Sequence, residues 1–99
     1  MPSPLSDAEL SDALAALPSW TREADGRSDA LVQTRRFADF RAAVAFIVRV
    51  AFEAEEAGHH PEITNVYDRV TLRLTTHDAG NRLTERDVAL ARAIDQLAS

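Results

Sequence analysis

The chain of 99 residues contains no cysteine and no lysine, and only three glycines. The absence of cysteine excludes disulfides and any nucleophile or metal ligand based on a thiolate. The sequence also has no low-complexity tract, no apolar run long enough to cross a bilayer, and no basic segment followed by an apolar one near its start. We therefore expect a cytoplasmic protein with no membrane partner. Because every basic residue is arginine and alanine is abundant, we expect a GC-rich, bacterial source.

Acidic residues outnumber basic ones, with 16 Asp and Glu against 11 Arg and a formal net charge of −5. Affinity for a phosphate backbone comes from clustered basic side chains, so direct nucleic-acid binding is not expected. Hydrophobic residues make up 45% of the chain, which is enough for a real core at this length. The sequence thus indicates one compact domain over residues 1–99, small enough for oligomerisation to matter.

Helix caps, apolar periodicity and turn residues together predict seven elements. Ser6 with Glu9 and Thr84 with Asp87 have the spacing of a capping box, and Asp39 is a further helix cap. In order, the predicted elements are a helix over 7–17, strands over 20–23 and 30–37, a helix over 39–57, strands over 63–67 and 70–76, and a last helix from 84 to 97. Hairpins separated by helices indicate an α+β fold, a four-stranded antiparallel sheet with helices on one face, in the order α-β-β-α-β-β-α.

The long predicted helix is apolar around a wide arc. Its apolar positions are a stripe of Phe40, Val44, Ile47, Ala51 and Ala54, and a second set of Phe46, Val50 and Ala57. So broad an arc predicts burial on two sides, by the sheet and by another subunit. Core packing is the expected role of the aromatic residues, which are Trp20, Tyr67 and the four phenylalanines.

All three histidines fall on either side of the second predicted hairpin, as His59, His60 and His77. Gly58 suits the left-handed residue that ends a helix, and Pro61 prevents the helix from continuing. Adjacent histidines on an extended segment point to opposite sides, so His59 and His60 are expected to do different jobs rather than chelate one ion together. Antiparallel pairing returns His77 to the neighbourhood of the pair. The residues leave three interpretations open: structural histidines, a metal site with two or three histidine ligands, and acid/base chemistry without a metal.

Three carboxylates crowd the last turn of the long predicted helix, where the helix dipole disfavours them and like charges repel. Of these, Glu53 and Glu56 are expected to be solvated, whereas Glu55 is the candidate for holding a histidine. Asp87 already has a sufficient role as a helix cap, and it is also a candidate for a second role at the site.

Four short motifs in register resemble those of the pterin-4a-carbinolamine dehydratase family, and the order of elements agrees as well. The motifs are Glu55-x-x-x-His59-His60-Pro61, Asn65-Val66-Tyr67, Thr76-His77 and Leu83-Thr84-Glu85-Arg86-Asp87, with the downstream aromatic and the third histidine in place. The resemblance extends from the strand at Trp20 to the last helix. It implies loss of water from 4a-hydroxytetrahydropterin to give quinonoid dihydropterin, a hydro-lyase step that recycles the cofactor of aromatic amino acid hydroxylases, without a metal or organic cofactor.

The resemblance also implies roles for individual residues. His59 and His77 become the acid/base pair, because the 4a-hydroxyl needs a proton donor and N5 needs a proton acceptor. His60 positions the pterin and takes part in proton transfer if the order is reversed. The expected orienting or binding groups are Glu55, Asp87 and the backbone of Thr75, Thr76 and Asp78.

Two departures from relatives concern the substrate. Ile63 follows Glu62 where several relatives have an aromatic residue, and the loop over 78–82 is slightly longer than in some members. Homodimers or homotetramers are expected. A competing function is a non-catalytic dimerisation or assembly module, since a vertebrate relative is a dimerisation cofactor of a homeodomain transcription factor and inactive relatives assist assembly of a carbon-fixing enzyme. Catalysis ranks first because all three histidines are present. A third possible function is that of a metallohydrolase, which predicts stoichiometric bound zinc.

Overall fold

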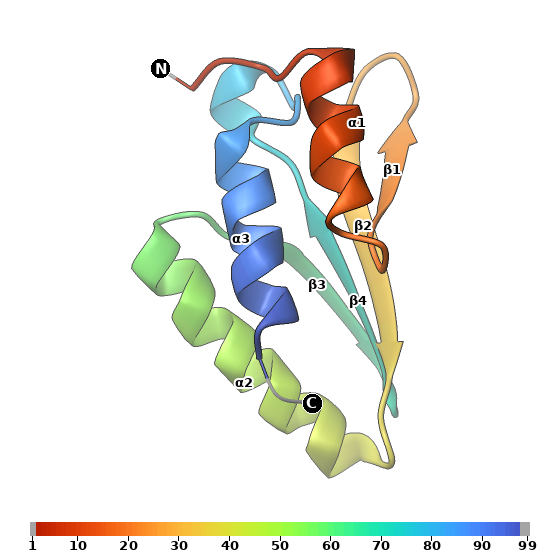
Figure 1. Cartoon of the computed structure of the whole chain (residues 1–99). Helices are drawn as coiled ribbons and strands as arrows, with labels where there is room; N and C mark the ends of the chain where they lie inside the picture. Colours follow the sequence, from red (N-terminus) through yellow and green to blue (C-terminus); the bar gives the residue numbers. More distant parts are fainter. Residues whose placement is uncertain (1, 98–99) are drawn as a thin grey trace.

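The structure is a computed structural model that describes residues 2–97. Its elements, shown in Figure 1, are α1 (Asp7–Ala15), β1 (Thr21–Ala24), β2 (Asp29–Arg36), α2 (Phe40–Ala57), β3 (Glu62–Val66), β4 (Arg69–Leu74), a short 3-10 turn η1 (His77–Ala79) and α3 (Glu85–Asp95). The α+β fold and the predicted element order are confirmed, with η1 as an addition. The first and last helices each end two residues earlier than predicted.

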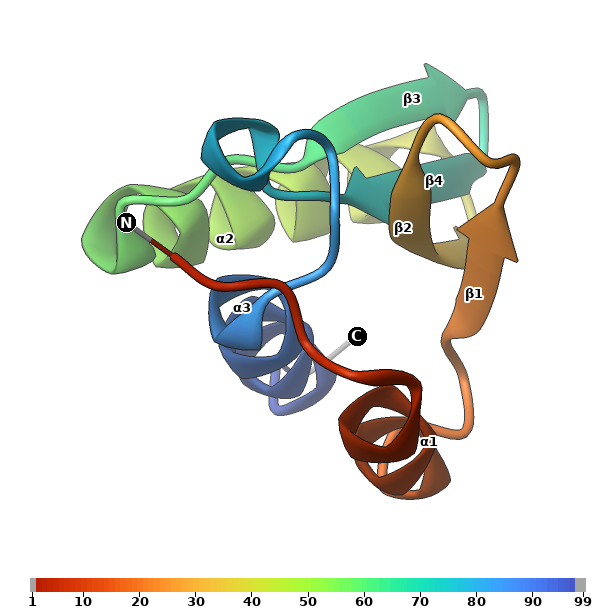
Figure 2. The same ribbon diagram turned by 90° about the horizontal axis from the view of Figure 1, so that it is seen from above.

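One antiparallel sheet with the strand order β1-β2-β4-β3 forms the centre of the fold. On β4, the buried side chains Val70, Leu72 and Leu74 alternate with partly exposed ones, so one face of the strand is in the core. The three helices lie on this side of the sheet (Figure 2). The opposite face is polar, where Thr34 and Thr71 hydrogen-bond across β2 and β4 at 3.0 Å. The sheet therefore has one covered face and one face toward solvent.

The predicted helix caps are all present. Ser6 and Glu9 form a capping box at α1, and Thr84 and Asp87 form one at α3. The Oδ1 atom of Asp39 accepts a hydrogen bond from the first turn of α2 at 2.9 Å. Each cap satisfies backbone N–H groups that have no partner within the helix, so local sequence alone marks where these three helices begin.

The sheet covers only one side of the wide apolar arc predicted for α2. The core-facing residues are Ala43, Phe46, Val50 and Ala54. Of the predicted stripe, Phe40 is 50% exposed and Val44 is 37% exposed, so these residues lie on the side of α2 that the sheet does not cover, and their burial by another subunit stays a prediction. The helix carries two adjacent apolar arcs, and periodicity does not tell which of them faces the sheet.

The prediction that all aromatic residues pack in the core was wrong in part. Trp20 and Phe46 are buried, and the Trp20 indole donates a hydrogen bond to Asp95 at 2.9 Å. In contrast, Phe52 is 73% exposed on α2, and Tyr67 is 66% exposed in the turn between β3 and β4. A tight turn projects its side chains into solvent whatever their polarity.

The end of α2 sets the start of the histidine segment. Gly58 adopts φ +64°, and the N–H of His59 donates to the carbonyl of Ala54 at 3.1 Å. This is the hydrogen-bond pattern of a helix that ends through one left-handed residue. The backbone of His59 is thus held by the helix itself.

Replacing Gly58 by alanine is expected to destabilise the protein, although a Cβ at this position would meet no atom within 4 Å. The cost is that of a left-handed backbone for a residue with a side chain, about 1–2 kcal/mol. Gly58→Asn is expected to cost less, because asparagine tolerates this conformation. Urea unfolding of the three proteins measures the difference. A Gly58→Ala variant as stable as the parent would contradict the prediction.

Candidate active site

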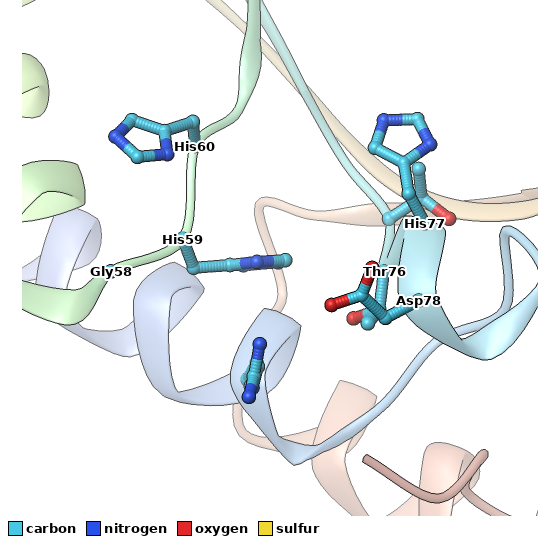
Figure 3. Close-up of a pocket in the computed structure, with 8 residues that line it drawn as sticks. Gly58, His59, His60, Thr76, His77 and Asp78 are labelled. Carbon is cyan, nitrogen blue, oxygen red and sulfur yellow. The ribbon is translucent and has the colours of Figure 1, made fainter. Parts of the chain in front are cut away.

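A pocket lies before the start of β3 and after the end of β4, between the end of α2 and the start of α3. In the sheet Glu62 is paired with Arg73, and extending this register sets His60 opposite Thr75. The pocket has a volume of about 190 Å³ and is lined by Gly58, His59, His60, Thr75, Thr76, His77, Asp78 and Arg86. Figure 3 shows the three histidines around it. Segments that are distant in sequence therefore bring all three predicted histidines to one pocket.

His59 is the buried member of the three. Its Nε2 atom lies 2.6 Å from Oδ1 of Asp87, and the two side chains are 10% and 0% exposed. The other oxygen of Asp87, Oδ2, accepts the backbone N–H of Thr84 at 2.9 Å as part of the α3 capping box. An ionised carboxylate only accepts hydrogen bonds, so Nε2 of His59 is the donor. Asp87 therefore caps α3 and holds His59 at the same time.

His60 points to the other side of the chain, toward the end of α2 (Figure 3). Its Nε2 atom lies 3.0 Å from Oε1 of Glu55, and the side chains are 67% and 79% exposed. The two adjacent histidines thus contact carboxylates on different helices. This is the alternation that an extended segment produces.

His77 stands at the beginning of η1. Its Nδ1 atom lies 2.6 Å from Oδ1 of Asn81, a residue that follows Gly80 and has φ +60°. The amide oxygen accepts the Nδ1 proton, which leaves Nε2 of His77 without its proton in the neutral ring. Sequence reasoning missed Asn81. A signal was present, because asparagine after glycine is typical of left-handed turns.

The hydroxyl of Thr75 and the backbone of Thr76 already have hydrogen-bond partners within the protein. The hydroxyl of Thr75 donates to the carbonyl of Asp29 at 2.8 Å. The N–H of Thr76 donates to the carbonyl of Arg82, and its own carbonyl accepts the N–H groups of Ala79 and Asn81. The backbone of Thr76 is therefore already bonded.

Two exposed charged residues complete the lining of the pocket. Asp78, an expected binding residue, is exposed beside the histidines. Arg86 is also exposed and lines the pocket from α3, and sequence reasoning missed it as a site residue. Its position within the Thr-Glu-Arg-Asp motif was the available signal. The two side chains place one negative and one positive charge at the pocket.

Within residues 2–97, no three side chains of His, Asp or Glu lie so that they could hold a metal ion. No helix in the same range is long and apolar enough to cross a membrane.

Comparison with known proteins decides the family. The family model described as pterin 4 alpha carbinolamine dehydratase matches residues 3–97. The chain belongs to this family. A protein of Opitutus terrae, provisionally named pterin-4-alpha-carbinolamine dehydratase, is 50% identical over 97 residues, which is 98% of this chain and 96% of the relative. A protein of Rhizorhabdus wittichii with the same provisional name is 56% identical over 95 residues, which is 96% of this chain and 95% of the relative.

Two solved structures resemble the fold. A protein of Brucella melitensis described as a transcriptional coactivator/pterin dehydratase has a TM-score of 0.86 and 38% identity, and 97% of this chain and 99% of that one are covered. A pterin dehydratase-like protein identified as a RuBisCO assembly factor in the alpha-carboxysome has a TM-score of 0.64 and 26% identity, covering 78% of this chain and 86% of that one. The fold thus occurs both in a protein described as a coactivator/pterin dehydratase and in one described as an assembly factor.

Replacing Asn81 by glycine is expected to release the ring of His77 without disturbing the loop. Glycine adopts positive φ at no steric cost, so the free energy of unfolding should change little. The Nδ1 proton loses its acceptor, and ¹⁵N NMR of the imidazole should show a mixture of tautomers in place of one. Asn81→Asp, which keeps an acceptor, is the matched control. An unchanged spectrum in Asn81→Gly would show that the amide does not set the tautomer.

Proposed function

We propose that the protein is a 4a-hydroxytetrahydrobiopterin dehydratase that works by histidine acid/base catalysis. One observation carries the proposal: His59 and His77 line one pocket, and each has one ring nitrogen bonded to a partner on the protein. Nδ1 of His59 and Nε2 of His77 remain for proton exchange with a ligand. Two such imidazoles are what a dehydration needs, since one proton must be given and one taken.

The reaction consists of two proton movements around one C–O bond. The bond from C4a to the hydroxyl oxygen breaks, the oxygen takes a proton and leaves as water, and N5 loses its proton as the double bond between C4a and N5 forms. We assign proton donation to His59, because the carboxylate of Asp87 lies beside the ring and balances its positive charge. His77 has a neutral amide partner and accepts the N5 proton.

The remaining lining residues position the substrate in this proposal. His60, held by Glu55, forms one wall, and Thr75, Asp78 and Arg86 offer polar contacts to the edge of the ring. The volume of about 190 Å³ is below the range of roughly 300–1,000 Å³ usual for larger ligands. It suits a flat bicyclic ring whose substituent stays in solvent. The reaction would serve a pathway that recycles the pterin of an aromatic amino acid hydroxylase.

Replacing His59 and His77 by alanine is expected to lower the rate of dehydration by about 10²–10⁴-fold, the usual contribution of a positioned acid or base. Stopped-flow measurement with synthetic 4a-hydroxytetrahydropterin gives the rate, and urea unfolding shows whether the variants stay folded. His60→Ala is the comparison, with an effect mainly on KM. A folded double variant with near-normal turnover would refute histidine catalysis.

Turnover by this mechanism requires no metal and no organic cofactor. Elemental analysis of the active protein and an assay with a chelator test this point. Stoichiometric zinc together with loss of activity on chelation would favour a metal-dependent hydrolase instead.

We also propose that the chain forms a homodimer or homotetramer through the outer face of α2. This surface, here called the α2 stripe, consists of Phe40, Val44, Val48 and Phe52, which are 37% to 73% exposed. A contiguous exposed apolar face is typical of a protein interface. Two antiparallel α2 helices centred on Val48 would place Arg41 of one copy beside Glu55 of the other, because the two positions are equally distant from Val48. The charges at the two ends of the α2 stripe are then complementary.

Val48→Glu is expected to convert the oligomer to monomers, since it places a charge at the centre of this contact. Sedimentation velocity at micromolar concentration measures the change. Thr34→Glu, a substitution on the polar face of the sheet, is the control and should leave the oligomer intact. A parent protein that sediments as a monomer under these conditions would refute the interface.

The α2 stripe also favours a second candidate function, that of an assembly or dimerisation module. The solved assembly factor shows that the fold occurs in a protein described by that role. In this case the partner would displace the second copy from the α2 stripe, and no dehydration would be measured. The stopped-flow assay separates the two functions.

A further inference from the structure

We propose that the hydroxyl groups of Thr76 and Thr84 form a buried chain that keeps Asp87 an acceptor and thereby fixes the tautomer of His59. Both threonines are positioning residues, because they act on the reaction through Asp87 and His59. The inference deepens the proposed function and rests on it, since it concerns the histidine assigned to proton transfer.

The hydroxyl chain runs from the start of α3 to the pocket through short hydrogen bonds. The Oγ1 atoms of Thr84 and Thr76 are 2.7 Å apart, and Oγ1 of Thr76 lies 2.8 Å from Oδ2 of Asp87. The other carboxylate oxygen lies 2.6 Å from His59. Thr76 and Thr84 are each 1% exposed, and Asp87 is fully buried. Water does not reach these groups, so their protons must be placed within the chain.

The number of available protons decides which hydroxyl donates and which accepts. Each hydroxyl has one proton to donate, and an ionised carboxylate has none. The proton of Thr76 goes to Asp87, so the proton between the two hydroxyls comes from Thr84. Thr84 Oγ1 in turn accepts the backbone N–H of Arg86 at 3.2 Å. Every donor then has an acceptor, and no buried side-chain polar atom of the described residues lacks a partner.

This arrangement points three donors at Asp87. Oδ2 receives the Thr76 hydroxyl and the N–H of Thr84, and Oδ1 receives His59. A proton on Oδ2 would take the place of one of the two donors there, and a proton that Oδ1 shared with Nε2 of His59 would weaken both bonds at Oδ2, because a carboxylate accepts hydrogen bonds more strongly when it is ionised. The hydroxyl chain therefore keeps Nε2 of His59 protonated. Proton exchange is confined to Nδ1, the atom on the pocket side.

The other hydrogen bonds of Thr76 and Thr84 do not use their hydroxyl protons. The capping of α3 uses Oγ1 of Thr84 as an acceptor from Arg86, and this leaves the hydroxyl proton unassigned. The backbone of Thr76 bonds Arg82, Ala79 and Asn81, and its side chain takes no part in those bonds. A serine at position 84 or 76 would serve equally well, whereas a valine would not.

Thr76→Val removes one hydroxyl and keeps the branched shape, and Thr76→Ser keeps the hydroxyl. We expect Thr76→Val to lower kcat by about 10–100-fold with little change in KM, the size of the loss when a group that orients a metal-ligating histidine is removed. Thr76→Ser should return kcat to within about threefold of the parent. In ¹⁵N NMR the parent and Thr76→Ser should show the neutral His59 ring protonated at Nε2, and Thr76→Val a mixture. Normal kcat and an unchanged tautomer in Thr76→Val would overturn the proposal.

The parent protein provides a test that does not depend on the variant folding. A neutral His59 protonated at Nδ1 in the parent spectrum would overturn the proposal outright. The outcome is also separable from the proposed function. If His59→Ala turns over normally, catalysis by His59 fails, while the tautomer measured in the parent and in Thr76→Ser still supports or refutes the hydroxyl chain.

Discussion

A single buried carboxylate joins the parts of this protein that matter for its site. Asp87 caps α3, accepts the hydroxyl at the end of β4 and holds His59 beyond the end of α2. The carboxylate is fully buried and has no access to water. Burying it without partners would be costly, and three donors remove that cost. The same constraint that stabilises the fold thus orients the ring assigned to proton transfer.

The two apolar arcs of α2 face different surroundings. The arc through Phe46 packs on the sheet, where Phe37 lies 5.0 Å from its ring centre and Arg35 lies over the ring at 4.8 Å. The α2 stripe faces outward and ends near Glu55, the partner of His60. A second copy on the α2 stripe would therefore lie next to the exposed histidine. The proposed interface and the outer wall of the pocket would then share one helix.

Much of the fold was predictable because its signals are local. Ser6 with Glu9 marks a helix start within four residues, and Gly58 marks a helix end by its conformation alone. The buried arc of α2 was not predictable, since Phe40 and Phe46 look alike in sequence and only the sheet distinguishes them. The three histidines and Asp87 were predicted as site residues from their positions in the sequence, and the family motifs predicted their roles.

The contacts of the site were less accessible from sequence. The bond between His59 and Asp87 spans 28 residues, and no local pattern reports it. Asn81 lies four residues from His77, yet its role depends on a left-handed backbone that the sequence only permits. Threonine hydroxyls are common helix caps, so the sequence predicts the capping role of Thr84. Neither composition nor spacing predicts its second hydrogen bond, to the hydroxyl of Thr76.

The shared duty of Asp87 also links local stability to activity. The first turn of a helix is where fraying begins, and such openings occur at a smaller free-energy cost than global unfolding. When the first turn of α3 opens, Asp87 leaves both the cap and the imidazole. Heat inactivation of this protein would then follow the opening of one helix end and precede the loss of the sheet.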